Sequence, residues 1–379
     1  MKLILMSFLH HKYSETILVF LVYSSIKEFI KSQGICLTII WSRLTLNYIK
    51  NNPELFGLLI ATLCCYFFLE IQLDGADFGE QGLLSGIDII VISFLASSLI
   101  AVVAVIAGVG GGVIFTPLLL AFTSFDTLLI RSTGLIVAMF SGLISTGPLM
   151  RKGLADIKLV LLGALPIIVG GMSGSMAAIY LASSFGEQSD GIVRLSLGLM
   201  LMLIASVFII KSGASDYPVL NKSDKLSKRL KLRKTYWEDT ISSFVKYRAN
   251  NTKLSISLFL LIGFTGGFYG LGGGWAVVPV LNLVMNIPLK VATGTSGVLL
   301  ALGNAAAIWP YINVGALIGI IAAPWMLGQV IGGIIGAGLL TSLKASWVRL
   351  LLIVILLSSS AKLIVRGFES LTNINIPFF

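Results

Sequence analysis

Two glycine-rich runs are the residues of this 379-residue chain whose spacing most directly suggests chemistry. Each has the form G-x-G-G-G-x-x-x-x-P-x-L, once from Gly108 to Leu119 and once from Gly270 to Leu281. Three consecutive glycines cost about 1 kcal/mol each in a helix relative to alanine, so we expect a helix break at each run. An apolar segment follows each run, which puts the glycines at a helix N-terminus. Their free backbone amides, with the positive end of the helix dipole, could hold a small oxyanion.

Polar side chains in the apolar body could add donors to such an anion site. We predict a site built from six glycine amides, three hydroxyl groups and one side-chain amide, namely Gly110, Gly111, Gly112, Gly272, Gly273, Gly274, Thr133, Thr295, Ser296 and Asn304. A hydrogen bond between helices is the alternative role for each of the four side chains. The same two roles are open for Gln329, another polar residue in an apolar segment.

The remaining residue types speak against most enzyme chemistry. The two histidines, His10 and His11, lie far from the main apolar body, which disfavours a buried metal site or a Ser-His-Asp triad. The three cysteines, Cys36, Cys64 and Cys65, have neither zinc-site spacing nor the pattern of a disulfide framework. We expect no metal, no cofactor and no enzymatic activity.

Acidic side chains are scarce in the apolar body. Positions 240–368 contain no Asp or Glu, and positions 89–186 contain only Asp126 and Asp156, both near the ends of apolar segments. A buried carboxylate would repel an anion, and it is the usual carrier in a proton relay or sodium site. The scarcity therefore favours an anion over a cation. Coupling through Asp126, a lysine or backbone carbonyls stays open.

Two basic residues occupy nearly equivalent places after the two glycine runs, Arg131 and Lys290. They could attract anions at opposite mouths of a pathway. The alternative is that both extend their charged ends to the membrane surface from the ends of helices.

The overall composition places all these residues in a membrane. Apolar residues make up 56% of the chain and charged residues 12%, about half the charged fraction of a soluble domain. We expect an all-α, polytopic helical membrane protein with two sets of five apolar segments. The segments fall near 86–107, 113–125, 132–150, 157–185 and 192–211, and then near 254–269, 275–287, 294–310, 314–343 and 347–366. The short ones, 113–125 and 275–287, are expected to be half-helices or tilted pieces that pack against protein.

The second set of segments repeats the first at an offset of 162 residues. From 99 to 181, 16 of 83 positions are identical to those in the second copy, and ten of these are Gly or Pro. Since Gly and Pro set backbone geometry, this is a repeat of shape. Duplicated halves with matched glycine breaks are typical of a secondary transporter with its site between the repeats. The pairs Gly170/Gly174 and Gly332/Gly336 have the G-x-x-x-G spacing of close helix packing instead.

Charge predicts the orientation. The segment 211–253 carries 11 Lys or Arg against 4 Asp or Glu, which favours the cytoplasmic side and is compatible with contact to anionic lipid headgroups rather than to nucleic acid. Five crossings per half would insert the second half inverted, unless 113–125 turns back. We therefore divide the chain into an N-terminal extension with amphipathic or extra membrane segments (1–85), a first repeat (86–211), a basic cytoplasmic loop (212–253), a second repeat (254–366) and a tail (367–379).

At the two glycine motifs the chain resembles the sulfite exporter TauE/SafE family of membrane transporters. Each motif is followed by a segment of small residues and threonine, Arg131–Gly134 and Ala292–Ser296, in which Arg131 departs from the family pattern. The resemblance covers roughly residues 86–366. It implies that sulfur oxyanions or organosulfonates move across the cell membrane, and we expect a bacterial inner membrane. An anion channel and a transporter of an unrelated small anion or metabolite are the alternatives.

Overall fold

The computed structural model describes residue 60 and residues 86–107, 110–123, 125–151, 153–210, 224–238, 242–339 and 345–372. The histidines, the cysteines and almost all of the N-terminal extension, with what we expect of them, lie outside the described residues.

Apart from the region around residues 224–248, the described residues form two sets of five helical segments. The first set contains α5 (Gly86–Ala107), α6 (Gly112–Phe122), α7 (Thr127–Arg151), α8 (Ile157–Phe185) and α9 (Glu187–Ile210). The second contains α11 (Thr252–Tyr269), α12 (Gly274–Pro279) continued by the π-helix η2 (Val280–Val284), α13 (Leu289–Asn313), α14 (Gly319–Leu339) and α15 (Ala345–Thr372). The starts of α6, α7 and α8, shifted by 162, fall on the starts of α12, α13 and α14. The repeat of the sequence is therefore also a repeat of helix boundaries.

Between the two sets lies a small folded segment that the sequence did not predict. It contains the short helix α10 (Lys225–Arg229) and an antiparallel pair of strands, β1 (Arg233–Glu238) and β2 (Ser243–Arg248). The side chains of Tyr236 and Tyr247 are buried, whereas Trp237 and Phe244 are half or more exposed. This alternation is the period of two that a half-buried strand requires.

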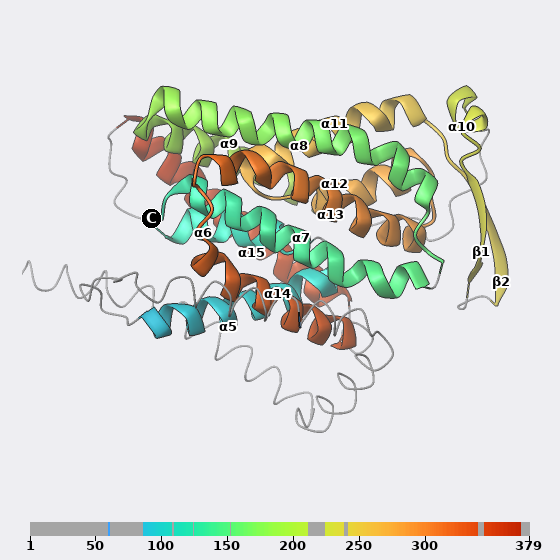
Figure 1. The fold of residues 1–379 in the computed structure, drawn as a ribbon, viewed down its shortest axis with the longest axis horizontal. Helices are drawn as coiled ribbons and strands as arrows, with labels where there is room; N and C mark the ends of the chain where they lie inside the picture. The colour runs from blue at the N-terminus through green and yellow to red at the C-terminus, as the bar shows by residue number, and fades with distance from the viewer. Residues whose placement is uncertain are drawn as a thin grey trace, which may run out of the picture. The chain divides into compact units, whose positions relative to one another are not determined.

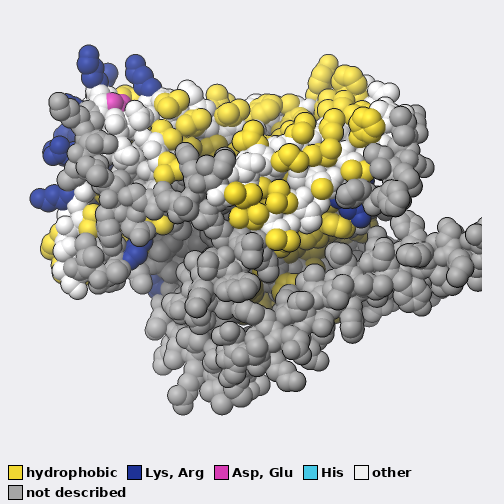
Figure 2. Space-filling view, turned by 180° about the vertical axis from the view of Figure 1, so that it is seen from behind, with side chains coloured by type: hydrophobic (Ala, Val, Ile, Leu, Met, Phe, Trp, Pro, Cys, Tyr) yellow, Lys and Arg dark blue, Asp and Glu magenta, His cyan; other side chains and the backbone are white. Residues whose placement is uncertain are grey.

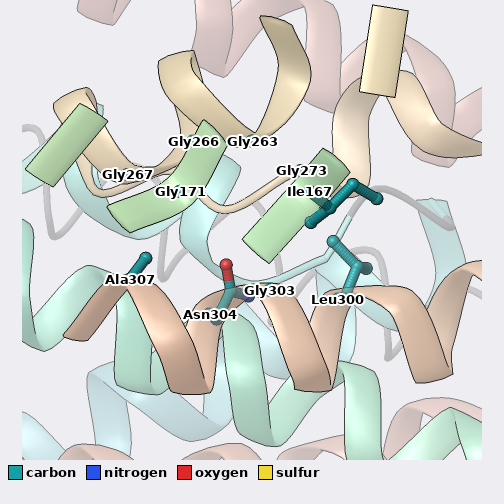
Figure 3. A pocket seen from close by; sticks show the side chains of 10 residues that line it. All are labelled: Ile167, Gly171, Gly263, Gly266, Gly267, Gly273, Leu300, Gly303, Asn304 and Ala307. Atoms are coloured by element: carbon teal, nitrogen blue, oxygen red, sulfur yellow. The ribbon is translucent and has the colours of Figure 1, made fainter. Parts of the chain in front are cut away.

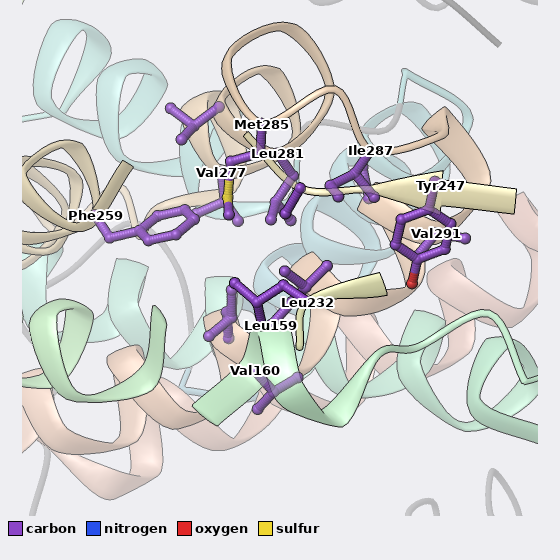
Figure 4. Packing of buried hydrophobic residues seen from close by; sticks show 14 of the residues in the cluster. Leu159, Val160, Leu232, Tyr247, Phe259, Val277, Leu281, Met285, Ile287 and Val291 are labelled. Atoms are coloured by element: carbon purple, nitrogen blue, oxygen red, sulfur yellow. The ribbon is translucent and has the colours of Figure 1, made fainter. Parts of the chain in front are cut away.

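The hairpin packs on the ends of helices from both repeats (Figure 1). Figure 4 shows Leu232 and Tyr247 among apolar side chains that include Leu159 of α8 and Ile287 and Val291 at the start of α13. Lys234 Nζ also donates to the carbonyl oxygens of Gly153 and Ala155, at 2.9 and 3.3 Å, in the turn between α7 and α8. The described residues of the basic loop, 224–238 and 242–253, are thus part of the folded body.

The order of contacts gives the direction of each helix relative to its neighbours. Positions 163, 167 and 171 of α8 meet positions 299, 303 and 307 of α13 in turn, so these two helices run the same way. Positions 170 and 174 of α8 meet positions 260 and 264 of α11, so α11 also runs with α8. Because α11 and α13 share one direction, residues 270–288 between them carry the chain back across the bundle. The short segment α12–η2 therefore belongs to a return crossing.

The first repeat has the same arrangement with the opposite direction. Positions 97 and 102 of α5 meet positions 328 and 336 of α14, and positions 132 and 144 of α7 meet positions 316 and 333. Hence α5, α7 and α14 share a direction. Gly142 of α7 meets Leu300 of α13, and Leu154 just after α7 meets Gly294, so these two equivalent helices run in opposite directions. The orientation of the two repeats relative to a membrane stays a prediction.

The G-x-x-x-G pairs lie where close packing was expected. A Cβ at Gly170 or Gly174 would collide with the backbone oxygen of Leu260 or Phe264 in α11, and one at Gly332 with that of Ser98 in α5. Shifting Leu260 back by 162 gives Ser98, so the two contacts are equivalent. In Figure 1 α11 lies along α8 and α14 along α5. In each repeat, therefore, glycines of one helix pack directly on the backbone of a helix of the other repeat.

The outer surface is suited to lipid. Five helices of the described part of the chain are long and apolar enough to span a membrane. One of them, α8, also exposes large side chains on its outer face: Leu161, Leu165 and Tyr180 are each 70–71% exposed. Figure 2 shows apolar side chains spread over the face in view, with most of the visible Lys and Arg gathered at one end. By contrast, eight of the eleven residues of α6 are buried, as expected for a short segment packed against protein.

Candidate functional site

Both glycine runs break the helical path, as predicted. Gly110 and Gly272 have φ values of +82° and +66°, in the left-handed region that favours glycine. Gly111 and Gly273 then stand as N-caps of α6 and α12, and each carbonyl oxygen accepts hydrogen bonds from the amides three and four residues later, at 2.9–3.2 Å. The first two amides of each short helix are left without an acceptor in the helix.

The two breaks touch each other. A Cβ at Gly110 would lie 3.9 Å from Gly274 Cα, and one at Gly112 would lie 2.6 Å from the carbonyl oxygen of Leu271. Cβ atoms at Gly112 and Gly272 would both come within 2.8 Å of Ala138 Cβ, about halfway along α7. The breaks therefore meet inside the bundle and against a helix of the first repeat.

A small cavity lies beside the second break (Figure 3). It measures about 10 Å³, the space that one water molecule requires. Ten residues from α8, α11, the second break and α13 line it, and six of them are glycines. The ten are Ile167, Gly171, Gly263, Gly266, Gly267, Gly273, Leu300, Gly303, Asn304 and Ala307. Backbone therefore forms much of its wall.

Asn304 is the polar side chain of this cavity. It is 5% exposed, and its Nδ2 has no hydrogen-bond partner in the described part of the chain. Figure 3 shows the side chain pointing from α13 toward the glycines of α8 and α11. Leaving a buried amide unpaired costs about 1–3 kcal/mol. In Figure 3 the amide oxygen points toward these glycines and the nitrogen lies nearer α13, so the buried Nδ2 is a spare donor at the edge of the cavity.

Two further polar groups near the breaks are buried and incompletely paired. Thr133 Oγ1 has no hydrogen-bond partner among the described residues, and neither does Gln329 Oε1. Gln329 Nε2 donates to the backbone oxygen and to Oγ of Ser97 in α5, at 3.2 Å each, which is the bond between helices that was one of its two expected roles. The amide of Gly111 donates to Ser141 Oγ at 3.0 Å. Ser141 is not among the site residues predicted from the sequence.

Two predicted site residues lie elsewhere and bond within the protein. Thr295 Oγ1 accepts from the amide of Asp156 at 3.1 Å, and Ser296 Oγ donates to the carbonyl oxygen of Thr293 at 2.8 Å. Thr295 is nine residues from Asn304, about 13 Å along the helix. The structure therefore does not bring these two hydroxyl groups to the cavity. It favours the bond between helices for Thr295, whereas Ser296 bonds within its own helix α13.

Neither expectation for Arg131 fits the structure. Its side chain is 0% exposed, so it neither reaches the membrane surface nor stands at an open mouth. The sequence position near a helix start suggested exposure, but the C-terminal turn of α11 covers it, with Arg131 Nη1 donating to Phe268 O at 3.2 Å. Lys290, by contrast, is exposed near the start of α13.

Asp126 and Asp156, the two acids expected near the ends of apolar segments, lie at helix starts. Asp126 Oδ1 accepts from the amides of Leu128 and Leu129, and Asp156 caps α8 by accepting from the amide of Lys158. Asp156 Oδ2 also accepts from Tyr247 Oη at 2.6 Å. Burial, and next the negative charge of Asp156, raise the pKa of the Tyr247 hydroxyl above its ordinary value. Neither carboxylate lines the cavity.

The described residues contain no group of three or more His, Cys, Asp or Glu that could hold a metal ion.

Comparison with known proteins identifies relatives of the whole helical body. The family model described as "Sulfite exporter TauE/SafE" matches residues 93–363. The probable membrane transporter protein YunE of Bacillus subtilis is 26% identical over 272 residues, which cover 69% of this chain and 93% of the relative. A probable membrane transporter protein of Xylella fastidiosa is 36% identical over 92 residues, covering 24% of this chain and 34% of the relative. No solved structure matches.

Proposed function

Because the chain belongs to the sulfite exporter TauE/SafE family and is a multi-pass membrane transporter, we propose that it moves a small anion, a sulfur oxyanion or an organosulfonate, across the cell membrane. The site that we propose is centred on the cavity beside the second glycine break, between α8, α11 and α13. Because the cavity holds about one water molecule in this conformation, the helices around it must move apart for an anion to enter.

The observation that carries this proposal is the unpaired Nδ2 of Asn304 in a cavity walled by glycine backbone. An anion that leaves water must have its hydration replaced by donors. Asn304 supplies one such donor, and the first amides of α12, which begins beside the cavity, supply others together with the positive end of a helix. No carboxylate lines the cavity to repel a negative charge.

Thr133 and the first break complete the proposed pathway. Thr133 Oγ1 is buried and unpaired, and its neighbour Gly134 packs against Gly270 at the start of the second run. Gly111 lies in the first break, and its amide donates to Ser141 Oγ in this conformation. We propose that the anion passes between the two breaks, with the basic loop on the cytoplasmic side.

Asn304→Asp tests the site, because it keeps the shape of the side chain and replaces its amide donor with a negative charge. We expect sulfite or methanesulfonate uptake into proteoliposomes to fall at least tenfold. Asn313→Asp is the matched control, since it makes the same change at an exposed position at the end of α13. The control should transport like the wild type. Equal transport by Asn304→Asp and the wild type would rule out Asn304 as part of the site.

Counterflow separates a carrier from a channel. A carrier loaded with unlabelled anion inside the vesicle accumulates labelled anion transiently, with saturation. A channel passes current without such exchange. Saturable counterflow is the outcome that we expect, and current without exchange would favour the channel.

A further inference from the structure

Arg131 is the largest side chain that is fully buried in the described part of the chain. Its guanidinium donates to three oxygen atoms: Nε to the carbonyl oxygen of Thr127 at 3.1 Å, Nη2 to Thr127 Oγ1 at 3.4 Å, and Nη1 to the carbonyl oxygen of Phe268 at 3.2 Å. The guanidinium carbon Cζ of Arg131 lies 5.9 Å from the centre of the Phe268 ring. The side chain is thus held in place between α7 and the end of α11.

Each nitrogen of the guanidinium thus has a hydrogen-bond partner, but the positive charge has no negative charge bonded to it. All three acceptors are neutral, and Arg131 forms no ion pair with a described residue. Asp190 connects to it through Thr127, whose Oγ1 donates to Asp190 Oδ1 at 2.7 Å. That carboxylate also interacts with the charge of Arg194. The carbonyl groups at the end of α11 offer only the partial negative charge of a helix C-terminus.

The buried charge lies next to the cavity. Phe268, which accepts from Arg131, directly follows Gly267 in the cavity wall. Tyr311 Oη donates to the carbonyl oxygen of Gly267 at 3.0 Å, and Tyr311 stands one helical turn beyond the wall residue Ala307. The backbone of Arg131 also packs against Gly270, at the start of the second break. One cation therefore borders the site without contacting its interior.

We infer that Arg131 is the specificity-determining residue of the site, and that its positive charge makes the site selective for anions. The inference rests on the proposed function and names the source of its charge preference. A buried cation without a full counter-charge is costly, and an anion in the cavity supplies that counter-charge. Because Arg131 acts through the electric field and not by contact, its effect is on anion affinity rather than on the rate of movement.

The test compares three variants in proteoliposome uptake of methanesulfonate. Arg131→Gln removes the charge and keeps hydrogen-bond donors, so the half-saturating concentration should rise at least about tenfold while the maximal rate changes by less than about threefold. Arg131→Lys keeps the charge and should stay within about threefold of the wild type. Tyr311→Phe removes another bond to the end of α11 without changing charge, and it should also stay within about threefold.

A purely structural role for Arg131 gives another pattern. If the guanidinium only caps α11, Arg131→Lys should fail with Arg131→Gln, and Tyr311→Phe should resemble both. That result, or an unchanged half-saturating concentration in Arg131→Gln, overturns the inference. A wild type that transports none of the anions tested would instead defeat the proposed function itself.

A measurement on the wild type alone covers the case in which Arg131→Gln does not fold. Methanesulfonate and dimethyl sulfone are similar in size, and only the first carries a charge. Methanesulfonate should compete with labelled sulfite for uptake, and dimethyl sulfone should not compete at a hundredfold higher concentration. Equal competition by the two would overturn the inference.

Discussion

At the residue scale, the surroundings of each glycine separate packing from a role in the site. Gly170 and Gly174 press on the backbone of α11, where any side chain would force the helices apart. Gly171, next to them on α8, lines the cavity instead, and a Cβ there would meet Ala307 Cβ at 3.1 Å and the carbonyl oxygen of Gly303 at 3.2 Å. One helix thus carries both kinds of glycine on adjacent positions.

Gly171→Ala should abolish most anion transport with little loss of stability, because one methyl group occupies a cavity that holds about one water molecule. Gly163→Ala is the matched control: it lies on the same helix, and its Cβ would meet Leu299 methyl groups at a similar 3.1 Å, away from the cavity. Uptake and thermal unfolding in detergent check both variants. Normal uptake by Gly171→Ala, or equal losses in the two variants, would argue against this cavity as the site.

Part of this residue-level picture can be predicted from sequence. The positions of the breaks follow from the cost of glycine in helices, and the packing role of Gly170 and Gly332 follows from their spacing. The roles of Thr295 and Arg131 do not, because they depend on which chain segment covers a side chain. The amide of Asp156 donates to Thr295 Oγ1, and the end of α11 covers Arg131.

At the scale of elements, the helix boundaries were largely readable and the hairpin was not. The segments expected at 86–107 and 157–185 coincide with α5 and α8, since long apolar runs between turn residues identify helices well. In β2, the inward-facing Val245 and Tyr247 alternate with the exposed Phe244, Lys246 and Arg248, and the high charge of the loop concealed that pattern. The period of two in these strands was the signal that could have identified it.

The hairpin is held to the helix ends by the bond from Tyr247 to Asp156, and this bond predicts a pH dependence. The pKa of Tyr247 is raised above its ordinary value, so its contribution to stability is complete at neutral pH and is lost as the pH rises above about 10. Tyr247→Phe should destabilise the protein at pH 8 by about 1–3 kcal/mol, because a buried carboxylate oxygen loses its donor.

Thermal unfolding of the wild type and of Tyr247→Phe at pH 8 and pH 10.5 measures both effects. The difference between the two proteins should be smaller at the higher pH. Phe244→Leu, a change at an exposed position on the same strand, serves as the control and should show a pH-independent difference. A gap between wild type and Tyr247→Phe that grows with pH would contradict the assigned direction of the pKa shift.

At the scale of the whole helical body, the equivalent helices α7 and α13 run in opposite directions, and so do α9 and α15, whose residues 191 and 198 meet residues 371 and 364. Opposed repeats of this kind are what an inverted-topology transporter contains. The sequence predicted the inversion from five apolar segments per half and from the charges of the loops, but only the contacts between helices give the directions. The side of the membrane on which each end lies is still to be measured.

Single cysteines at the two ends of the bundle should label from opposite sides of the membrane. In a background with Cys36, Cys64 and Cys65 replaced by serine, Ser242→Cys in the hairpin turn should react with a membrane-impermeant maleimide only from the cytoplasmic side. Gln188→Cys at the start of α9 should react from the other side. Both positions are exposed. Reaction of both from one face would refute the proposed topology.

The contact between the two breaks links the evolution of the duplicated halves. A methyl group gained at Gly112 in one copy would lie 2.6 Å from the backbone of Leu271 in the other. In the other direction, a Cβ at Gly270 would collide with the backbone of Arg131 in the first half. A side chain gained at one of these glycines is therefore restricted by the backbone of the other half, although only 16 of 83 positions are identical between the two halves.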